Sequence, residues 1–110
     1  MAAYTEIYIE QYTDFSTKIN LSDDQGDSMN LVGYSASSQM RKSYYSSSVE
    51  TFTVNFTNRA AGEIEVVMTS ANTANVSPGR YMFDVVITDP TAKRSRVVEG
   101  IANVLAGVTR

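Results

Sequence analysis

The segment from Val76 to Asp89 constrains the fold of this chain most strongly. It begins with the turn-forming pair Pro78-Gly79 and continues into a run of β-branched and aromatic residues that stops before Pro90. Successive side chains of a β-strand point to opposite faces, and both alternating sets of this run carry apolar residues. One face would carry Tyr81, Phe83, Val85 and Ile87, and the other Met82, Asp84, Val86 and Thr88. So apolar a segment predicts a strand at the centre of its sheet.

The turn in front of this strand has a recognisable form. An apolar residue, Val76, precedes Pro78 and Gly79, and Tyr81 follows two residues after the glycine. This arrangement resembles the corner of immunoglobulin-like sandwiches, in which the tyrosine hydroxyl donates a hydrogen bond to the backbone just upstream. We therefore predict a structural corner formed by Pro78, Gly79 and Tyr81.

Further alternating patterns predict six more strands, separated by polar or glycine-containing turns. These strands are expected at residues 7–12, 15–21, 34–41, 50–57, 63–69 and 94–104. Gly100 interrupts the last pattern and indicates a bulge or a close approach of another backbone. A length of 110 residues suits one domain. The sequence thus predicts a single all-β domain over residues 1–110, an immunoglobulin-like antiparallel β-sandwich of about seven strands.

The composition narrows the classes of function. The chain has no cysteine and no histidine, which excludes disulfides, thiolate metal sites and nucleophile systems that use His as the base. A formal net charge of -3 argues against a nucleic-acid binder that neutralises phosphates. We expect no membrane-spanning segment, no secretory signal and no cofactor. The sequence therefore predicts a protein that is not an enzyme and binds neither nucleic acid nor membrane.

Two acidic groups invite a functional interpretation. Asp23, Asp24 and Asp27 surround Gly26, but they lack the ligand order of a calcium loop, and aspartate is common in turns. Asp84 belongs to the central strand, where a solvated face or a cross-strand pair with Arg96 or Lys93 is favoured over acid–base catalysis. We therefore expect structural roles, and no metal site, for these carboxylates.

Aromatic residues indicate two candidate interfaces. Tyr44 and Tyr45 lie in a serine-rich segment, expected to be a loop, that follows the basic pair Arg41-Lys42 in the sequence. Such interleaving can bind single-stranded nucleic acid or glycan, but Tyr and Arg are also favoured at protein–protein contacts, which we prefer here. The first strand carries apolar bulk on both faces and is the other candidate for contact with a neighbouring subunit. Its candidate contact residues are Ile7, Tyr8, Ile9 and Tyr12.

The order of the motifs resembles a family of small immunoglobulin-like domains in tailed-bacteriophage virions. The members in question are the N-terminal domain of the phage upper baseplate protein and related virion structural proteins of marine phages. The resemblance rests on Asp14–Gly26, Leu31–Tyr34, Gly62–Ile64, Pro78–Val85 and Arg96–Gly100. Together these motifs run through nearly the whole chain, and their order and spacing are more specific than any one of them.

This resemblance implies a structural subunit of a virion. In that family the domain is an assembly module without catalytic residues. The position in the virion stays open among baseplate, tail, neck and capsid decoration. The partners implied are other virion proteins, together with a homo-oligomer of the chain itself. The alternative is a carbohydrate-binding or adhesin-like β-sandwich module, in which tyrosines would supply the stacking platform because the chain has no tryptophan.

Overall fold

The computed structural model describes residues 3–22, 25–43, 46 and 49–109. Within these residues it contains seven strands, a helix of one turn and a short 3-10 helix. In chain order the elements are β1 (Ala3–Glu10), β2 (Phe15–Asn20), β3 (Ser35–Arg41), β4 (Glu50–Asn58), the 3-10 helix η1 (Arg59–Ala61), β5 (Glu63–Met68), α1 (Ser70–Thr73), β6 (Gly79–Thr88) and β7 (Arg94–Leu105). Each predicted strand is present, but the first begins and ends earlier than expected.

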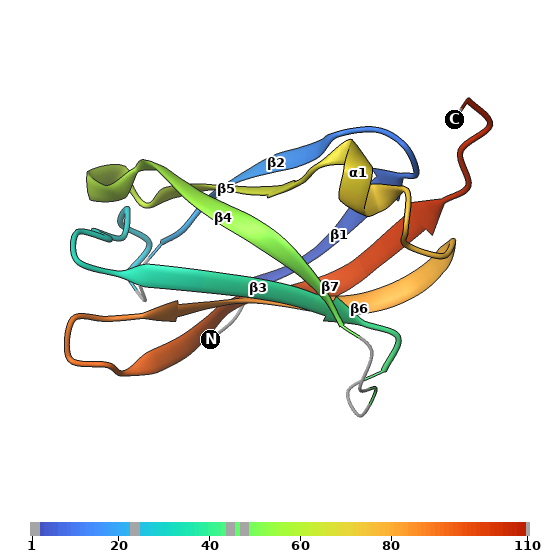
Figure 1. The fold of residues 1–110 in the computed structure, drawn as a ribbon. Helices are drawn as coiled ribbons and strands as arrows, with labels where there is room; N and C mark the ends of the chain where they lie inside the picture. The colour runs from blue at the N-terminus through green and yellow to red at the C-terminus, as the bar shows by residue number, and fades with distance from the viewer. Residues whose placement is uncertain (1–2, 23–24, 44–45, 47–48, 110) are drawn as a thin grey trace.

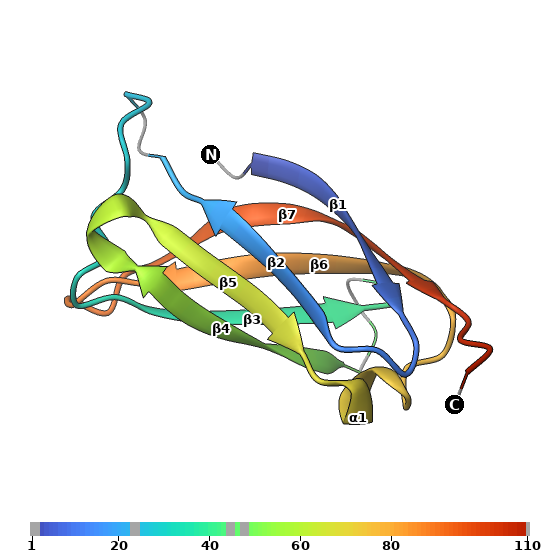
Figure 2. The ribbon, with the colours of Figure 1, turned by 90° about the horizontal axis from the view of Figure 1, so that it is seen from above.

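The strands of the described residues form one mixed sheet in the order β1-β7-β6-β3-β4-β5-β2. The sheet folds over so that β2, β5 and β4 lie across β1, β7, β6 and β3 (Figures 1 and 2). β4 makes this possible, because its first residues pair with β3 and its remainder pairs with β5. The sheet is therefore nearly closed into a barrel, with β1 and β2 as its two edge strands.

The β1–β7 pair corrects the expected architecture. These strands run parallel, with Ala3 beside Val98 and Glu10 beside Leu105. All other strand pairs that the structure describes are antiparallel. The prediction of a wholly antiparallel arrangement is wrong here because β1 arrives at the free edge of β7 from the far end of the chain. A parallel pair needs a long connection, and here almost the whole chain lies between the two strands.

Gly100 is the partner of Thr5 in the parallel β1–β7 ladder. A Cβ atom at this position would collide with the backbone carbonyl of Thr5. The close backbone approach that the sequence offered as one alternative is therefore present. The bulge lies elsewhere: Val85 pairs with Val98 and Val86 with Arg96, so Val97 is the extra residue of β7.

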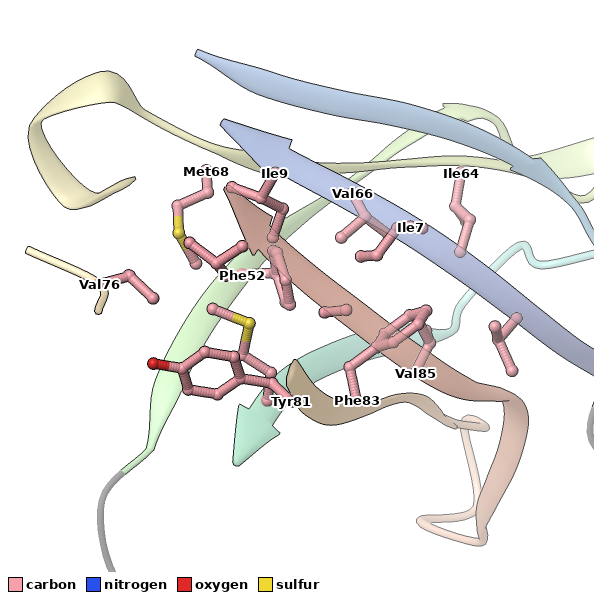
Figure 3. Packing of buried hydrophobic residues seen from close by; sticks show 14 of the residues in the cluster. Ile7, Ile9, Phe52, Ile64, Val66, Met68, Val76, Tyr81, Phe83 and Val85 are labelled. Carbon is pink, nitrogen blue, oxygen red and sulfur yellow. The ribbon is translucent and has the colours of Figure 1, made fainter. Parts of the chain in front are cut away.

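The core lies between the two parts of the folded sheet. Figure 3 shows the side chains of Phe52, Ile64 and Val66 facing those of Phe83 and Val85. The described buried apolar residues are Ile7, Ile9, Leu21, Leu31, Met40, Phe52, Ile64, Val66, Met68, Val76, Tyr81, Phe83, Val85, Ile87, Val98, Ala102 and Val104. The ring of Phe52 lies 5.9 Å from that of Phe15 and 6.2 Å from that of Phe83, centroid to centroid. These contacts join both parts of the sheet through aromatic pairs.

The corner before β6 is formed as its pattern predicts. The Tyr81 hydroxyl donates a hydrogen bond of 2.8 Å to the carbonyl of Ser77, and the ring is buried. Gly79 has φ +146, a conformation that side chains disfavour. The Gln11 side chain also donates to the carbonyl of Val76 at 2.7 Å. The corner is thus held both by its own tyrosine and by the turn after β1.

Helix α1 is held by the same turn. Its N-cap residue Thr69 makes no capping bond with its side chain, but Asp14 accepts a 2.7 Å bond from the backbone N–H of Ser70. The hydroxyl of buried Thr73 donates to the carbonyl of Thr13 at 2.8 Å. A helix this short is not stable alone, so these bonds to the β1–β2 connection position it.

Candidate interaction face

The outer surface of β1, β7, β6 and β3 carries aromatic, charged and apolar side chains. Alternation sends Ile7 and Ile9 of β1 inward, so that Tyr4 and Tyr8 point outward with 68% and 60% of their surface exposed. Strand register places Tyr4 beside Glu99 of β7, and Glu99 beside Asp84 of β6. Aromatic and charged side chains from distant parts of the sequence therefore meet on this outer face.

A groove of about 310 Å³ crosses this outer face. Its partly buried apolar floor is formed by Met82 and Ile101, which are neighbours on β6 and β7. The remaining wall is mostly polar. The side chains of all four strands that line the groove include Tyr4, Gln39, Arg41, Met82, Asp84, Arg96, Glu99 and Ile101.

The charged groups of the groove are joined to one another. The Arg96 Nε atom lies 3.2 Å from Asp84 Oδ2, and its Nη1 atom lies 3.2 Å from Glu99 Oε2. The Asp84–Arg96 pair is one of the two cross-strand pairs that the sequence offered. On β3, the Arg41 guanidinium donates a hydrogen bond to the carbonyl of Ser46 at 2.6 Å and another to Gln39 Oε1 at 3.3 Å. These contacts fix the planar polar groups in place, although exposed ion pairs of this kind add little stability.

A second polar cluster lies beside the groove on the same face. Glu6 accepts a hydrogen bond of 3.2 Å from the Asn103 amide and one of 3.3 Å from the Tyr8 hydroxyl. The Asn103 amide also contacts the carbonyl of Ile7 at 3.5 Å. The outward residues of β1 are therefore tied to β7 by side chains as well as by the strand ladder.

The residues predicted for the first-strand interface separate into three groups. Ile7 and Ile9 are core residues, 7% and 0% exposed, and cannot bring their side chains to a surface contact. Tyr8 is exposed on the outer face. Tyr12 is partly buried and has φ 67, which turns the chain after β1. An interface on β1 must therefore use its edge and its outward tyrosines.

Several other predicted residues lie outside the described part of the chain. Tyr44 and Tyr45 of the second candidate interface belong to this group, as do Asp23 and Asp24 of the acidic turn. Asp27 is described and exposed. Across the described residues no three carboxylates gather as a metal site would require. None of the helices in this part of the chain is long and apolar enough to cross a membrane.

Sequence reasoning missed Tyr4 and the groove. Tyr4 lay outside the predicted first strand, and Gln39 drew no attention in a serine-rich segment. The alternating pattern of Ile9 and Ile7 continues back to Thr5. A predicted strand that began one period of this pattern before Thr5 would have included Tyr4. Nothing in the sequence indicated that this tyrosine would come to lie beside β7.

No protein-family model matches this chain, and a comparison with curated proteins also finds no match. Among solved structures, the chain is similar to a family 123 glycoside hydrolase from Clostridium perfringens, studied for glycolipid glycan hydrolysis. The two share 14% identity at a TM-score of 0.46. The similarity covers 98% of this chain and 24% of the hydrolase, so the chain spans about a quarter of that protein's length. A likeness this distant identifies neither a family nor an activity.

Proposed function

We propose that this chain is a structural subunit of a tailed-phage virion, without catalytic activity, that acts through protein–protein contacts. The virion role derives from the sequence resemblance over Asp14–Gly26, Pro78–Val85 and the other shared motifs. The observation that carries the contact mechanism is the position of β1. It stands at one end of the strand order and pairs, among the described strands, with β7 alone.

We further propose that the fold is a variant of the immunoglobulin-like sandwich. Three features support this assignment. They are the Tyr81–Ser77 corner bond, the antiparallel β3-β6-β7 group and the passage of β4 from β3 to β5.

The chemistry of β1 suits assembly. The outer edge of an edge strand presents N–H and C=O groups to which another chain can add. Tyr4 and Tyr8 flank that edge with exposed rings, and tyrosine is enriched in protein interfaces. The expected partner is another virion protein or a second copy of this chain, in the symmetric homo-oligomer that is commonest for small subunits.

The decisive experiment measures the mass of the full chain in solution by sedimentation equilibrium, for the wild type and for Tyr8→Lys. A lysine on an edge strand opposes pairing with another strand, so we expect an oligomer that dissociates in the variant. Val32→Lys is the matched control, because Val32 is 62% exposed and lies in the connection between β2 and β3, outside the strands. A wild type that is monomeric at high concentration, or an oligomer unchanged by Tyr8→Lys, would refute self-assembly through β1.

Deletion of the first strand is not a valid substitute for this test. Removal of β1 would also remove Ile7 and Ile9 from the core. Loss of the oligomer could then reflect unfolding, whereas Tyr8→Lys changes only an exposed side chain.

A further inference from the structure

The groove on the outer face has the properties of a small-molecule site. Its volume of about 310 Å³ is at the lower end of the roughly 300–1,000 Å³ typical of ligand pockets. It combines an apolar floor with a few polar groups that converge from different strands. That combination is the usual form of a small-molecule pocket.

The charges of the groove cancel. Arg41 and Arg96 supply two positive charges, and Asp84 and Glu99 supply two negative charges. Because Arg96 bridges both carboxylates at 3.2 Å, neither sign dominates around it. An anionic or cationic ligand would gain attraction from one pair and meet repulsion from the other. The electrostatics therefore favour a ligand without net charge.

The polar groups of the groove are planar and are held in position. A carboxylate can accept several hydrogen bonds and a guanidinium carries five N–H donors. The mutual bonds of Asp84, Arg96 and Glu99 therefore leave capacity for a ligand while they fix orientation. Neighbouring hydroxyl groups on a sugar ring present donors and acceptors at the spacing that such planar groups bind in pairs. Preorganised partners also reduce the entropy lost on binding.

Tyr4 supplies the apolar part of such a site. Tyr4 is 68% exposed as a residue and lines the groove next to Glu99. The face of an aromatic ring carries partial negative charge, so the C–H groups on one side of a sugar ring pack well against it. The edge of the sugar would then meet the polar groups of β6 and β7.

We propose that this groove binds a short neutral saccharide, with the Tyr4 ring against one sugar face and with Asp84, Arg96 and Glu99 bonded to its hydroxyls. This site lies on the outer face of the sheet, whereas the contact proposed for assembly uses the free edge of β1. The two share Tyr4, but sugar binding does not depend on assembly. It also differs from the sugar site that the sequence suggested, which relied on Tyr44 and Tyr45.

The test is a titration of the isotope-labelled full chain with lactose, maltotriose, cellotriose and diacetylchitobiose, followed by amide NMR spectra. We expect at least one of them to shift amide signals of Tyr4, Met82 and Glu99 in a saturable manner. Tyr4→Ala and Glu99→Gln should each weaken that binding roughly tenfold, the loss expected for one good contact. Tyr4→Phe should retain it, since the ring stays.

Val32→Ala is the control, because Val32 is 62% exposed, does not line the groove and is not part of the proposed assembly contact. It should leave sugar affinity unchanged. The proposal is overturned if none of the four sugars shifts the groove signals, or if Tyr4→Ala binds as tightly as the wild type. It is equally overturned if sialyllactose binds more tightly than lactose, or if a random peptide library, and no sugar, occupies the groove.

Discussion

Tyr81 combines three contacts in one side chain. Its hydroxyl bonds the Ser77 carbonyl at 2.8 Å, its ring lies in the core, and the Lys42 ammonium lies 4.6 Å from the ring centroid. Only the first contact depends on the hydroxyl. Tyr81 therefore allows the corner bond to be tested without disturbing the packing around it.

We predict that Tyr81→Phe lowers the free energy of unfolding by about 1 kcal/mol, the usual net value of one buried hydrogen bond. The ring and its contact with Lys42 remain in the variant. Urea denaturation measures the change. Tyr4→Phe makes the same chemical change on an exposed ring and should have no measurable effect. Equal losses in both variants would show that the corner bond contributes nothing of its own.

The same hydroxyl predicts a dependence of stability on alkaline pH. Burial raises the pKa of Tyr81, and the nearby charge of Glu50 raises this pKa further. An unfolded tyrosine has a pKa of about 10. Because the folded pKa is the higher one, the contribution of Tyr81 is fully present below about pH 10. It is lost as the pH rises through the folded pKa. Urea denaturation at increasing pH above about 10 measures this loss. The free energy of unfolding should fall less steeply with pH in Tyr81→Phe than in the wild type.

At the scale of elements, the β1–β7 pair depends on a residue without a side chain. Thr5 approaches Gly100 so closely that its carbonyl occupies the place of a Cβ atom. β1 can lie in register with β7 from Ala3 to Glu10 only because of this glycine.

We predict that Gly100→Ala costs about 1–3 kcal/mol, as overpacking does elsewhere, and releases β1 locally. Amide hydrogen exchange should accelerate from Thr5 to Ile9. Gly26→Ala provides a contrast, since its Cβ would meet no atom within 4 Å but would strain a residue at φ +84. That variant should lose stability without faster exchange in β1. Unchanged exchange in Gly100→Ala would contradict the close approach.

The β6–β7 turn is closed by one carboxylate. Asp89 Oδ1 accepts bonds from the Thr91 hydroxyl at 2.7 Å and from the Thr91 and Lys93 amides, each at 2.9 Å. The hydrogen bond from the Thr91 hydroxyl, followed by that from the Lys93 amide, lowers the pKa of Asp89. The stabilisation of the turn is therefore present above the unfolded pKa of about 3.9 and is lost as pH falls through the lower folded value.

We predict that Thr91→Val moves the pKa of Asp89 back toward its ordinary value, while Thr91→Ser leaves it low. Carbon-detected NMR titration of the carboxyl group measures both. If Thr91→Val leaves the pKa where it is in the wild type, the hydroxyl is not the main cause of the shift.

At the scale of the whole molecule, β1 completes the core. The sheet nearly closes with β1 and β2 as its edges, and Ile7 and Ile9 fill the space beneath β1. The N-terminal segment is thus both an edge available for contact and a part of the core.

We predict that Ile9→Ala lowers the free energy of unfolding by about 2–5 kcal/mol, as expected for a fully buried isoleucine. Tyr8→Ala, one residue away on the opposite face, should stay within about 0.5 kcal/mol of the wild type. Thermal and urea denaturation would give both values. Similar losses in the two variants would mean that β1 does not contribute its inward face to the core.

The sequence predicted the elements well because each is encoded locally. Alternation of apolar residues located β2 to β7 to within about a residue at most ends, and the Pro78-Gly79 turn with Tyr81 predicted a hydrogen bond that is present. The first strand was misplaced because Tyr12 looked like a continuation of the alternation. Its φ of 67 instead ends the strand in a turn.

By itself, the sequence determined the all-β class, the strands, the turns and the corner, since these depend on propensities and on neighbours a few residues apart. Only the tertiary structure decided that β1 joins β7 in parallel and that the sheet nearly closes. It also decided that Tyr4 meets Glu99 and Asp84 in one groove. The contacts between β1 and β7 join residues from the two ends of the chain. In addition, a one-residue shift in strand register, such as the bulge at Val97, moves side chains from one face of the sheet to the opposite face. No local pattern encodes such a register.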